Sequence, residues 1–481
     1  MFCRSRFGSL FAFLLFVGLC ENDLFANPAD AKPLNVVFIL VDDMGWSDLS
    51  CYGSDYFESP QIDAFAKTGL RFTQAYAASC VCSPTRAAIL TGKDPARLKM
   101  TIWHEGAVEG GPFDRPLLPA KSKPNIDREE VTLAECFRMA GYATAHIGKW
   151  HLGTAAYYPE TQGYDLNVGG TFWGAPATFF YPYTGRWSNN NPELRYVPGL
   201  GAGNTGDYLT DKLTDAALTT MRQFADKPFF LSLWYHTVHS PIEGKPEMVQ
   251  RFTAKPKGQH HQDASYAAMI ASLDENVGRI LAELDELGLA ESTIVVLTSD
   301  NGGVDMDVRG HVPTSNWPLR SGKGTLYEGG LRVPLAIRWP GRTSADSICT
   351  VPVRSEDFFP TLIAGCEIEN TAQENLGDGL NILTWLEKPE TPAPDRSFHW
   401  HFPHYYPRMT PASAMRKDRW KLIHYYEDDR NELYDLNQDP GETKDLSALQ
   451  PQLTGMLRTE LDRWRSEVDA NVPTKNPNYR P

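Results

Sequence analysis

Apolar runs without polar alternation recur along the chain, and each of them ends in polar residues. The runs are 35–41 before Asp42 and Asp43, 229–235 before His236 and His239, and 293–299 before Asp300 and Asn301. A strand of this composition is buried on both faces, as in a parallel sheet between two layers of helices. Open α/β sheets bind ligands beyond the carboxyl ends of their strands. We therefore expect these polar side chains to meet at one edge of a sheet.

The segments between the apolar runs show helical spacing. In 266–284 the apolar residues fall three or four positions apart, which indicates an amphipathic helix. Strands that alternate with helices predict an α/β fold over 33–388, with a large, mostly parallel central sheet sandwiched by helices. Two stretches, 101–127 and 153–205, are rich in Gly, Pro and aromatic residues without periodicity. Loops of this length are usually functional, so we expect them to form the walls of a substrate pocket.

From about Pro389 the pattern changes to short runs. Residues 420–425 and 432–434 predict hairpin strands, and 449–468 shows helical spacing. These features predict a smaller C-terminal α+β subdomain over 389–481 that contains a short antiparallel sheet.

The first 26 residues have the features of a secretory signal peptide. Basic residues precede an apolar stretch at 7–20, and Ala26 is a small residue at the expected cleavage site. A lipoprotein signal ending at Cys20 is the alternative, although Leu19 is bulkier than lipoprotein processing normally accepts. The apolar stretch is short for a membrane-spanning helix. The protein is therefore expected to be secreted or periplasmic, without a stable membrane anchor.

Composition narrows the range of functions. The 481 residues are 42% hydrophobic and 22% charged, which is ordinary for a globular protein. The formal net charge of −14 disfavours nucleic acid as a partner, because phosphate binding needs a basic surface. Cysteines are scattered and do not form a disulfide framework. Cys349 and Cys366 either pair in an oxidising compartment or stay as two buried thiols.

The strongest chemical signal is the run Cys-Ser-Pro-Thr-Arg at 82–86, followed by Leu-Thr-Gly-Lys at 90–93. On its own the first run also fits a buried cysteine before a turn at Pro84 and a helix. Together the two runs resemble the signature of the type I sulfatases, arylsulfatase-like members of the alkaline phosphatase-like superfamily. The pattern selects Cys82 over Cys80, because only Cys82 has a proline two positions later.

The resemblance implies a residue that the gene does not encode. In this family the cysteine is oxidised to formylglycine by a sulfatase-maturing enzyme, and the hydrated aldehyde attacks the sulfur of a sulfate ester. An alcohol leaves, and the second hydroxyl then loses a proton and expels sulfate. Arg86 and Lys93 resemble family residues that steady the formylglycine.

The resemblance also implies a metal site. Asp42, Asp43, Asp300 and Asn301 match the family positions that ligate Ca²⁺ together with the formylglycine at position 82. Oxygen ligands suit hard cations, and several carboxylate and amide oxygens fit around Ca²⁺ more easily than around Mg²⁺. Each acidic pair alone would also fit an ordinary turn.

Four further residues match family positions that bind sulfate or move protons. They are Lys149 and His151 in Gly-Lys-Trp-His, His239 in a His-x-Pro block, and Lys323 in Gly-Lys-Gly-Thr-Leu-Tyr-Glu-Gly-Gly. The resemblance implies that the lysines hold sulfate, that His151 orients or deprotonates the nucleophile, and that His239 lies near the leaving oxygen. His236 lacks the following proline pattern, and Glu328 is better explained as structural.

These observations predict hydrolysis of a sulfate ester on a small molecule or, as we favour, on a glycan. The aromatic stretches 172–183 and 400–406 resemble surfaces that stack on sugars, although such clusters more often serve packing. One alternative is a phosphonate or phosphodiester hydrolase of the same superfamily. Another is a non-catalytic protein that binds sulfated glycans, if Cys82 is not matured.

Overall fold

The structure, a computed structural model, describes residues 1–2, 33–188, 191–308, 310–369 and 377–480. The chain divides into two units, Met1–Pro33 and Leu34–Pro481. The predicted signal peptide therefore lies outside the described residues from position 3 onward. Among the described residues, no helix combines the length and the apolar composition needed to cross a membrane.

A large sheet forms the centre of the Leu34–Pro481 unit. Its nine strands, counted over the described residues, follow the order β11-β2-β10-β9-β1-β8-β4-β5, with β12 also paired to β2. The strands are β1 (Asn35–Val41), β2 (Leu70–Tyr76), β4 (Ala143–Gly148), β5 (Leu166–Val168), β8 (Phe229–Trp234), β9 (Thr293–Ser299), β10 (Arg332–Arg338), β11 (Ser347–Cys349) and β12 (Val353–Arg354). Strand β10 runs antiparallel to β2 and β9, and the other neighbours are parallel. The predicted mostly parallel sheet is confirmed.

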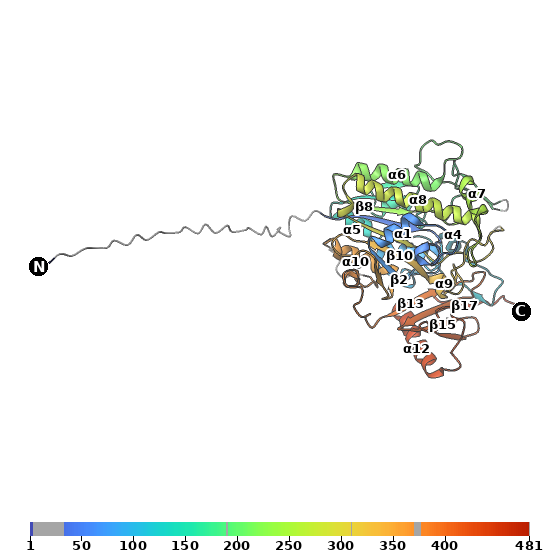
Figure 1. The fold of residues 1–481 in the computed structure, drawn as a ribbon. Coiled ribbons are helices and arrows are strands. Elements are labelled where there is room, and N and C mark those ends of the chain that lie inside the picture. The colour runs from blue at the N-terminus through green and yellow to red at the C-terminus, as the bar shows by residue number, and fades with distance from the viewer. Residues whose placement is uncertain (3–32, 189–190, 309, 370–376, 481) are drawn as a thin grey trace. The chain divides into compact units, whose positions relative to one another are not determined.

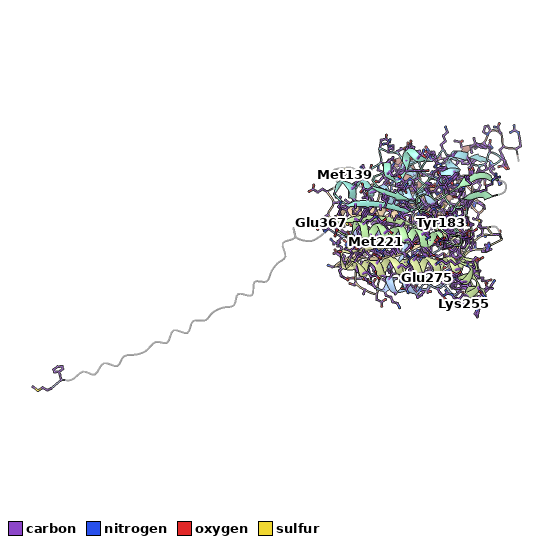
Figure 2. All side chains as sticks on the ribbon, turned by 90° about the horizontal axis from the view of Figure 1, so that it is seen from above. Met139, Tyr183, Met221, Lys255, Glu275 and Glu367 are labelled. Atoms are coloured by element: carbon purple, nitrogen blue, oxygen red, sulfur yellow. The ribbon has the colours of Figure 1, made fainter. Side chains whose placement is uncertain are left out.

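Helices cover both faces of this sheet, which explains the uninterrupted apolar runs. Odd-numbered residues of β1, from Val37 to Val41, enter one hydrophobic core, and even-numbered residues, from Val36 to Leu40, enter another. The first core includes α1 (Pro60–Lys67), α6 (Leu209–Phe224), α7 (Pro246–Ala254) and α8 (Ala264–Glu286), and the second includes α2 (Cys82–Thr91), α3 (Pro95–Leu98), α5 (Leu133–Met139) and α10 (Phe358–Gly365). Figure 1 shows α6 and α8 over the same face, and Figure 2 shows them side by side, marked by Met221 and Glu275.

A second, smaller sheet follows near the C-terminus (Figure 1). It is antiparallel and consists of β13 (Ser397–Phe402), β14 (Ala412–Lys417), β15 (Trp420–Tyr425) and β16 (Asn431–Asp435). One face packs against α12 (Pro451–Glu467), and the other shares a core with Tyr76 and Val81. The predicted short antiparallel sheet is confirmed, whereas the boundary at residue 388 stays a prediction.

The two long aperiodic stretches contain short elements. The first includes α4 (His104–Glu109) and β3 (Leu117–Leu118), and β3 pairs with β17 (Thr474–Lys475). The second includes a hairpin of β6 (Gly185–Ser188) and β7 (Asn191–Arg195). The remaining helices are α9 (Glu328–Leu331), α11 (Leu383–Glu387) and the 3₁₀ turns Ser50–Tyr52, Ala155–Tyr157, Pro159–Thr161, Ala290–Ser292 and Ser355–Asp357. Cys349 and Cys366 are free thiols in the structure; Cys349 is buried, whereas Cys366 is half-buried rather than buried as the second alternative expects.

Candidate active site

Cys82 is the first residue of α2, so the helix begins earlier than the turn that the sequence indicates at Pro84. Val81 is extended and precedes the helix, and Pro84 lies in the first turn, where a missing N–H costs no helical hydrogen bond. Cys82 is 2% exposed, and burial raises the pKa of its thiol to about 12. An unmodified thiol at this position is therefore a poor nucleophile near neutral pH.

The acidic residues meet at the carboxyl ends of β1 and β9, as the apolar runs predict. These strands are parallel neighbours that end in register at Val41 and Ser299, so Asp42 and Asp300 follow side by side. The backbone N–H of Asp43 donates to Oδ1 of Asp300 at 3.2 Å. Nδ2 of Asn301 donates to Oδ1 of Asp43 at 2.8 Å.

Two cations from other elements neutralise Asp42 and Asp300. Lys149 follows β4, and its Nζ lies 2.8 and 2.7 Å from the two carboxylate oxygens of Asp42. Arg86 lies one helical turn after Cys82. Its Nε donates to Oδ2 of Asp300 at 2.9 Å, and one terminal nitrogen forms an ion pair with the same oxygen at 2.8 Å. Residues four apart on a helix share a face, so α2 presents the cysteine and the arginine together.

Lys323 connects the nucleophile position to the acidic cluster. Its Nζ lies 2.7 Å from Oδ1 of Asp43 and 3.5 Å from Sγ of Cys82. Nε2 of His239 lies 3.5 Å from the other oxygen of Asp43. Five of the six predicted catalytic positions are therefore linked through the acidic cluster. The sixth, His151, lines the same cavity but contacts Glu105 instead.

Burial shifts the protonation of these groups. Burial raises the pKa of Asp42 to about 8, although Lys149 lies against it. For Asp43 burial acts in the same direction, but Lys323 and His239 outweigh it and hold its pKa below the usual range. A divalent cation beside Asp42 would favour its ionised form.

The carboxylate and amide oxygens of the cluster fit a hard cation. Asp42, Asp43, Cys82 and His239 each place one ligand atom within 4.8 Å of the others. Oδ1 of Asn301 is buried, and it has no hydrogen-bond partner within the described part of the chain. A buried acceptor without a donor costs free energy unless a ligand satisfies it. Carboxylate and amide oxygens in this arrangement suit Ca²⁺.

His151 lies on the other side of the pocket. Its Nε2 is 2.6 Å from Oε2 of Glu105, and Ser83 donates to its backbone carbonyl at 2.7 Å. Burial lowers the pKa of His151 to about 4, against the opposing effect of Glu105, and burial lowers that of His239 to about 3. Both imidazoles are therefore neutral near pH 7.

Three other residues discussed from the sequence lie elsewhere. Lys93 pairs with Glu130 at 2.6 Å beyond the far end of α2, about 15 Å from Cys82 along the helix. The structure therefore does not bring Lys93 to the nucleophile. His236 is buried outside the pocket lining, and Glu328 is fully buried against Lys421 at 2.9 Å, as expected for a structural residue.

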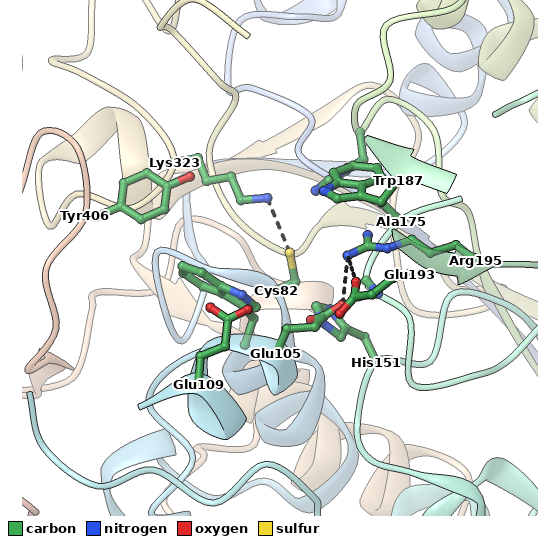
Figure 3. A pocket seen from close by; sticks show the side chains of 13 residues that line it. Cys82, Glu105, Glu109, His151, Ala175, Trp187, Glu193, Arg195, Lys323 and Tyr406 are labelled. Carbon is green, nitrogen blue, oxygen red and sulfur yellow. Dashed lines mark hydrogen bonds and ion pairs between the residues drawn. The ribbon is translucent and has the colours of Figure 1, made fainter. Parts of the chain in front are cut away.

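A cavity of about 260 Å³ opens above Cys82. Figure 3 shows Cys82, Lys323 and His151 around it, with further side chains from the aperiodic stretches and the C-terminal part. Those further residues include Trp103, Glu105, Glu109, Trp187, Arg195 and Tyr406. The expectation that 101–127 and 153–205 wall the pocket is confirmed. Individual residues such as Glu105 belong to no recognisable sequence motif. Only the length of the stretches that contain them indicated that they line the pocket.

The aromatic cluster at 400–406 mostly serves packing. Trp400 and Phe402 are fully buried, and His404 is buried with Nε2 2.8 Å from the hydroxyl of Thr101. Tyr406 lines the cavity above Cys82, and Tyr405 lines an adjacent groove of about 660 Å³. The residues able to meet a sugar are thus these two tyrosines rather than the whole cluster.

Comparisons with known proteins agree with this geometry. The sequence model of the sulfatase family matches residues 34–365, and that of the N-sulphoglucosamine sulphohydrolase C-terminal region matches 321–467. A sulfatase from Formosa agariphila is 32% identical over 96% of this chain and 95% of its own length. Human arylsulfatase A is 30% identical over 93% of this chain and 91% of its own. The crystal structure of Ps i-CgsB in complex with k-i-k-neocarrahexaose superposes with a TM-score of 0.75 at 26% identity, covering 93% of this chain and 95% of that one.

Proposed function

This chain belongs to the sulfatase family and is a sulfuric ester hydrolase, and we propose that it acts through a formylglycine made from Cys82 by a sulfatase-maturing enzyme. The observation that carries the proposal is the position of Cys82, buried at the start of α2 with Nζ of Lys323 at 3.5 Å. Formylglycine supplies a hydrated aldehyde whose hydroxyl serves as the nucleophile. The buried thiol itself would be a poor one.

The surrounding side chains have the charges that a sulfate ester requires. Lys149 and Lys323 flank the nucleophile position and would bind sulfate oxygens, while Arg86 holds Asp300 in place. Preorganised cations stabilise the charge that develops on a transferring group. His239 lies within the same cavity and would donate a proton to the leaving oxygen, since a bound anion favours its protonated form.

The cation site is proposed to hold Ca²⁺ rather than Mg²⁺. Asp42, Asp43, Asp300 and Asn301 would hold it together with the matured residue 82, and His239 stands beside them. When bound, the ion would polarise the sulfate group and neutralise the buried carboxylates. The unpartnered Oδ1 of Asn301 is the observation that supports this assignment.

A carbohydrate is the proposed source of the sulfate. The groove beside the cavity is lined by Tyr405, Tyr406 and Tyr425 with Arg115 and Arg430, and Tyr406 belongs to both. Tyrosine rings stack on sugar faces, and arginines pair with anionic groups along a sulfated chain. The oligosaccharide bound by the similar Ps i-CgsB supports the same substrate class. Because of the predicted signal peptide, we expect this activity outside the cell or in the periplasm.

Peptide mass spectrometry of active protein from its native source tests the nucleophile. We expect the 82–86 peptide to carry formylglycine, and recovery of unmodified cysteine alone would contradict the proposal. Matched aryl sulfate and aryl phosphate substrates test the reaction, because a phosphate monoester carries about one more negative charge near neutral pH. Faster phosphate hydrolysis would favour the phosphohydrolase alternative, and binding of sulfated sugar without turnover by matured protein would favour a binding role.

A substitution in the matured protein tests whether the substrate is a carbohydrate. Tyr405→Ala should raise KM for a sulfated oligosaccharide about tenfold or more while leaving KM for a small aryl sulfate within about twofold. Equal effects on the two substrates would show that the groove does not bind the glycan.

A further inference from the structure

Glu105 lies against His151 in the cavity but has no part in the chemistry described so far. It belongs to α4, and its Oε2 is 2.6 Å from Nε2 of His151 (Figure 3). The side chain of His151 is 4% exposed and that of Glu105 is 16% exposed. A short contact between largely buried groups fixes the relative orientation of carboxylate and ring.

The other oxygen of Glu105 also faces donors. The backbone N–H of Gly174 donates to Oε1 at 3.2 Å, and a terminal nitrogen of Arg195 lies 3.5 Å from the same atom. Arg195 in turn stacks over the rings of Trp173 and Trp187, 5.2 and 4.0 Å from their centroids. The position of Oε1 therefore requires an acceptor.

Gly174 also restrains the histidine ring. A Cβ atom at position 174 would lie 2.4 Å from Cε1 and 2.6 Å from Nε2 of His151, so the ring packs directly against the glycine backbone. The ring cannot turn away from Glu105 toward this side. Nδ1 points away from the carboxylate, is buried, and has no hydrogen-bond partner among the described residues.

These contacts determine which nitrogen carries the proton. A neutral imidazole has one N–H, and an ionised carboxylate only accepts hydrogen bonds. Nε2 must then hold the proton that it donates to Glu105, and Nδ1 presents its lone pair. His151 and Cys82 line the same cavity, and an unpartnered acceptor on such a residue is suited to receive a hydroxyl proton.

We propose that Glu105 is a positioning residue that fixes His151 in the tautomer whose Nδ1 accepts a proton from the hydroxyl of the matured residue 82. The inference rests on the proposed function and names the residue that prepares its base. One proton passes from the hydroxyl oxygen to Nδ1, and the electron pair of the O–H bond stays on the oxygen. The ring becomes an imidazolium cation, which the Glu105 carboxylate stabilises.

The substitution Glu105→Gln tests the tautomer with almost no change in shape. Because Gly174 and Arg195 require an acceptor at Oε1, the amide oxygen would occupy that position and the NH₂ group would face Nε2 of His151. Nε2 then becomes the acceptor, and the proton moves to Nδ1. The variant keeps a hydrogen bond to His151 but reverses its direction.

Two measurements report the effect. In ¹⁵N spectra of histidine-labelled protein with unmodified Cys82, assigned with His151→Gln, we expect protonated Nε2 in the parent and protonated Nδ1 in Glu105→Gln. In matured protein we expect kcat for a small aryl sulfate to fall about 100-fold or more, with KM within about threefold. The control Glu130→Gln makes the same change in the ion pair with Lys93, and it should keep both values within about threefold.

Glu105→Asp separates positioning from folding. It retains an acceptor-only carboxylate, so it should keep the parent tautomer and lose less activity than Glu105→Gln, even if the glutamine variant folds poorly. An unchanged tautomer in Glu105→Gln, or a reversed one in Glu105→Asp, would overturn the inference. The spectra need no turnover, so a failure of the proposed sulfatase chemistry would be seen separately, as inactivity of the matured parent.

Discussion

The charged clusters around Cys82 and around Lys421 both pair lysines with buried carboxylates, but only the cluster around Cys82 adjoins a cavity lined by the described residues. Lys421 lies 2.9 Å from both Glu328 and Glu442, and all three side chains are fully buried. The hydroxyl of Tyr76 donates to Glu328 at 2.6 Å, and Glu442 accepts the backbone N–H of Glu328 at 2.6 Å. This cluster joins the antiparallel sheet to the segment that follows Lys323.

The cluster around Cys82 opens onto a cavity instead. Lys323 touches both Asp43 and the nucleophile position, and Oδ1 of Asn301 has no partner among the described residues. Buried ion pairs shift pKa values in structural networks as well as in active sites. Oε1 of Glu442 also lacks a hydrogen-bond partner among the described residues, but it lies 2.9 Å from Nζ of Lys421. The adjoining cavity therefore identifies the functional cluster, whereas buried charge or an unpartnered acceptor alone does not.

The largest expected contrast comes from replacing each lysine with methionine. Lys323→Met should lower kcat/KM for an aryl sulfate about 100- to 1,000-fold, because it removes a cation beside the sulfate. Lys421→Met should destabilise the protein by about 3–5 kcal/mol, because it leaves buried carboxylates without their ammonium partner. Kinetics on folded protein and urea unfolding measure the two effects. If both variants lost the same stability and Lys323→Met kept the parent kcat/KM, the two clusters would not differ in function.

Removal of divalent cations should affect only the cluster around Cys82. At a Ca²⁺ concentration 100-fold above Kd the proposed ion would stabilise the folded protein by about 2.7 kcal/mol, which chelation would remove. Thermal unfolding with and without chelator should show this loss in the parent and in Glu442→Gln. Asn301→Ala should show a smaller one, and Mg²⁺ should restore less stability than Ca²⁺. A chelator response identical in Asn301→Ala and the parent would argue against the assigned ligand.

The Lys421 cluster should respond to pH. Burial raises the pKa of Glu442 from 4.5 to about 7, so between these values the folded protein holds a proton that the unfolded chain releases. The contribution of Glu442 to the free energy of unfolding therefore falls as the pH rises through this range. Glu442→Gln should remove a decline on the order of 1 kcal/mol between pH 5 and 7. Parallel pH profiles of parent and variant in urea unfolding would contradict this.

The sequence predicts the central strands β1, β8 and β9 well because their composition follows directly from burial on both faces. The expected strands 35–41 and 293–299 coincide with β1 and β9, and their ends bring Asp42 and Asp300 together. Such residues are recognisable because a local run of apolar side chains precedes them. The short motif around Cys82 is equally local.

The outer wall of the cavity could not be predicted in this way. Glu105 reaches His151 from a six-residue helix, and Arg195 reaches Glu105 from a hairpin 90 positions further along the chain. These contacts depend on how long aperiodic segments fold over the sheet, which no periodicity encodes. Lys93 is a different case, because the motif groups it with Cys82 although the helix between them separates the two by about 15 Å.

The smallest expected effect concerns Lys93, a third lysine whose ion pair is neither buried nor open to the cavity. Its pair with Glu130 is 20% exposed on both sides. Partly exposed pairs contribute about 0–1 kcal/mol, and a cation about 15 Å from the nucleophile adds little to sulfate binding. Lys93→Ala should therefore change kcat/KM less than about twofold, measured with an aryl sulfate beside Lys323→Met. A loss as large as that of Lys323→Met would return Lys93 to the site that the sequence motif assigns to it, and would require the C-terminal end of α2 to act on the nucleophile.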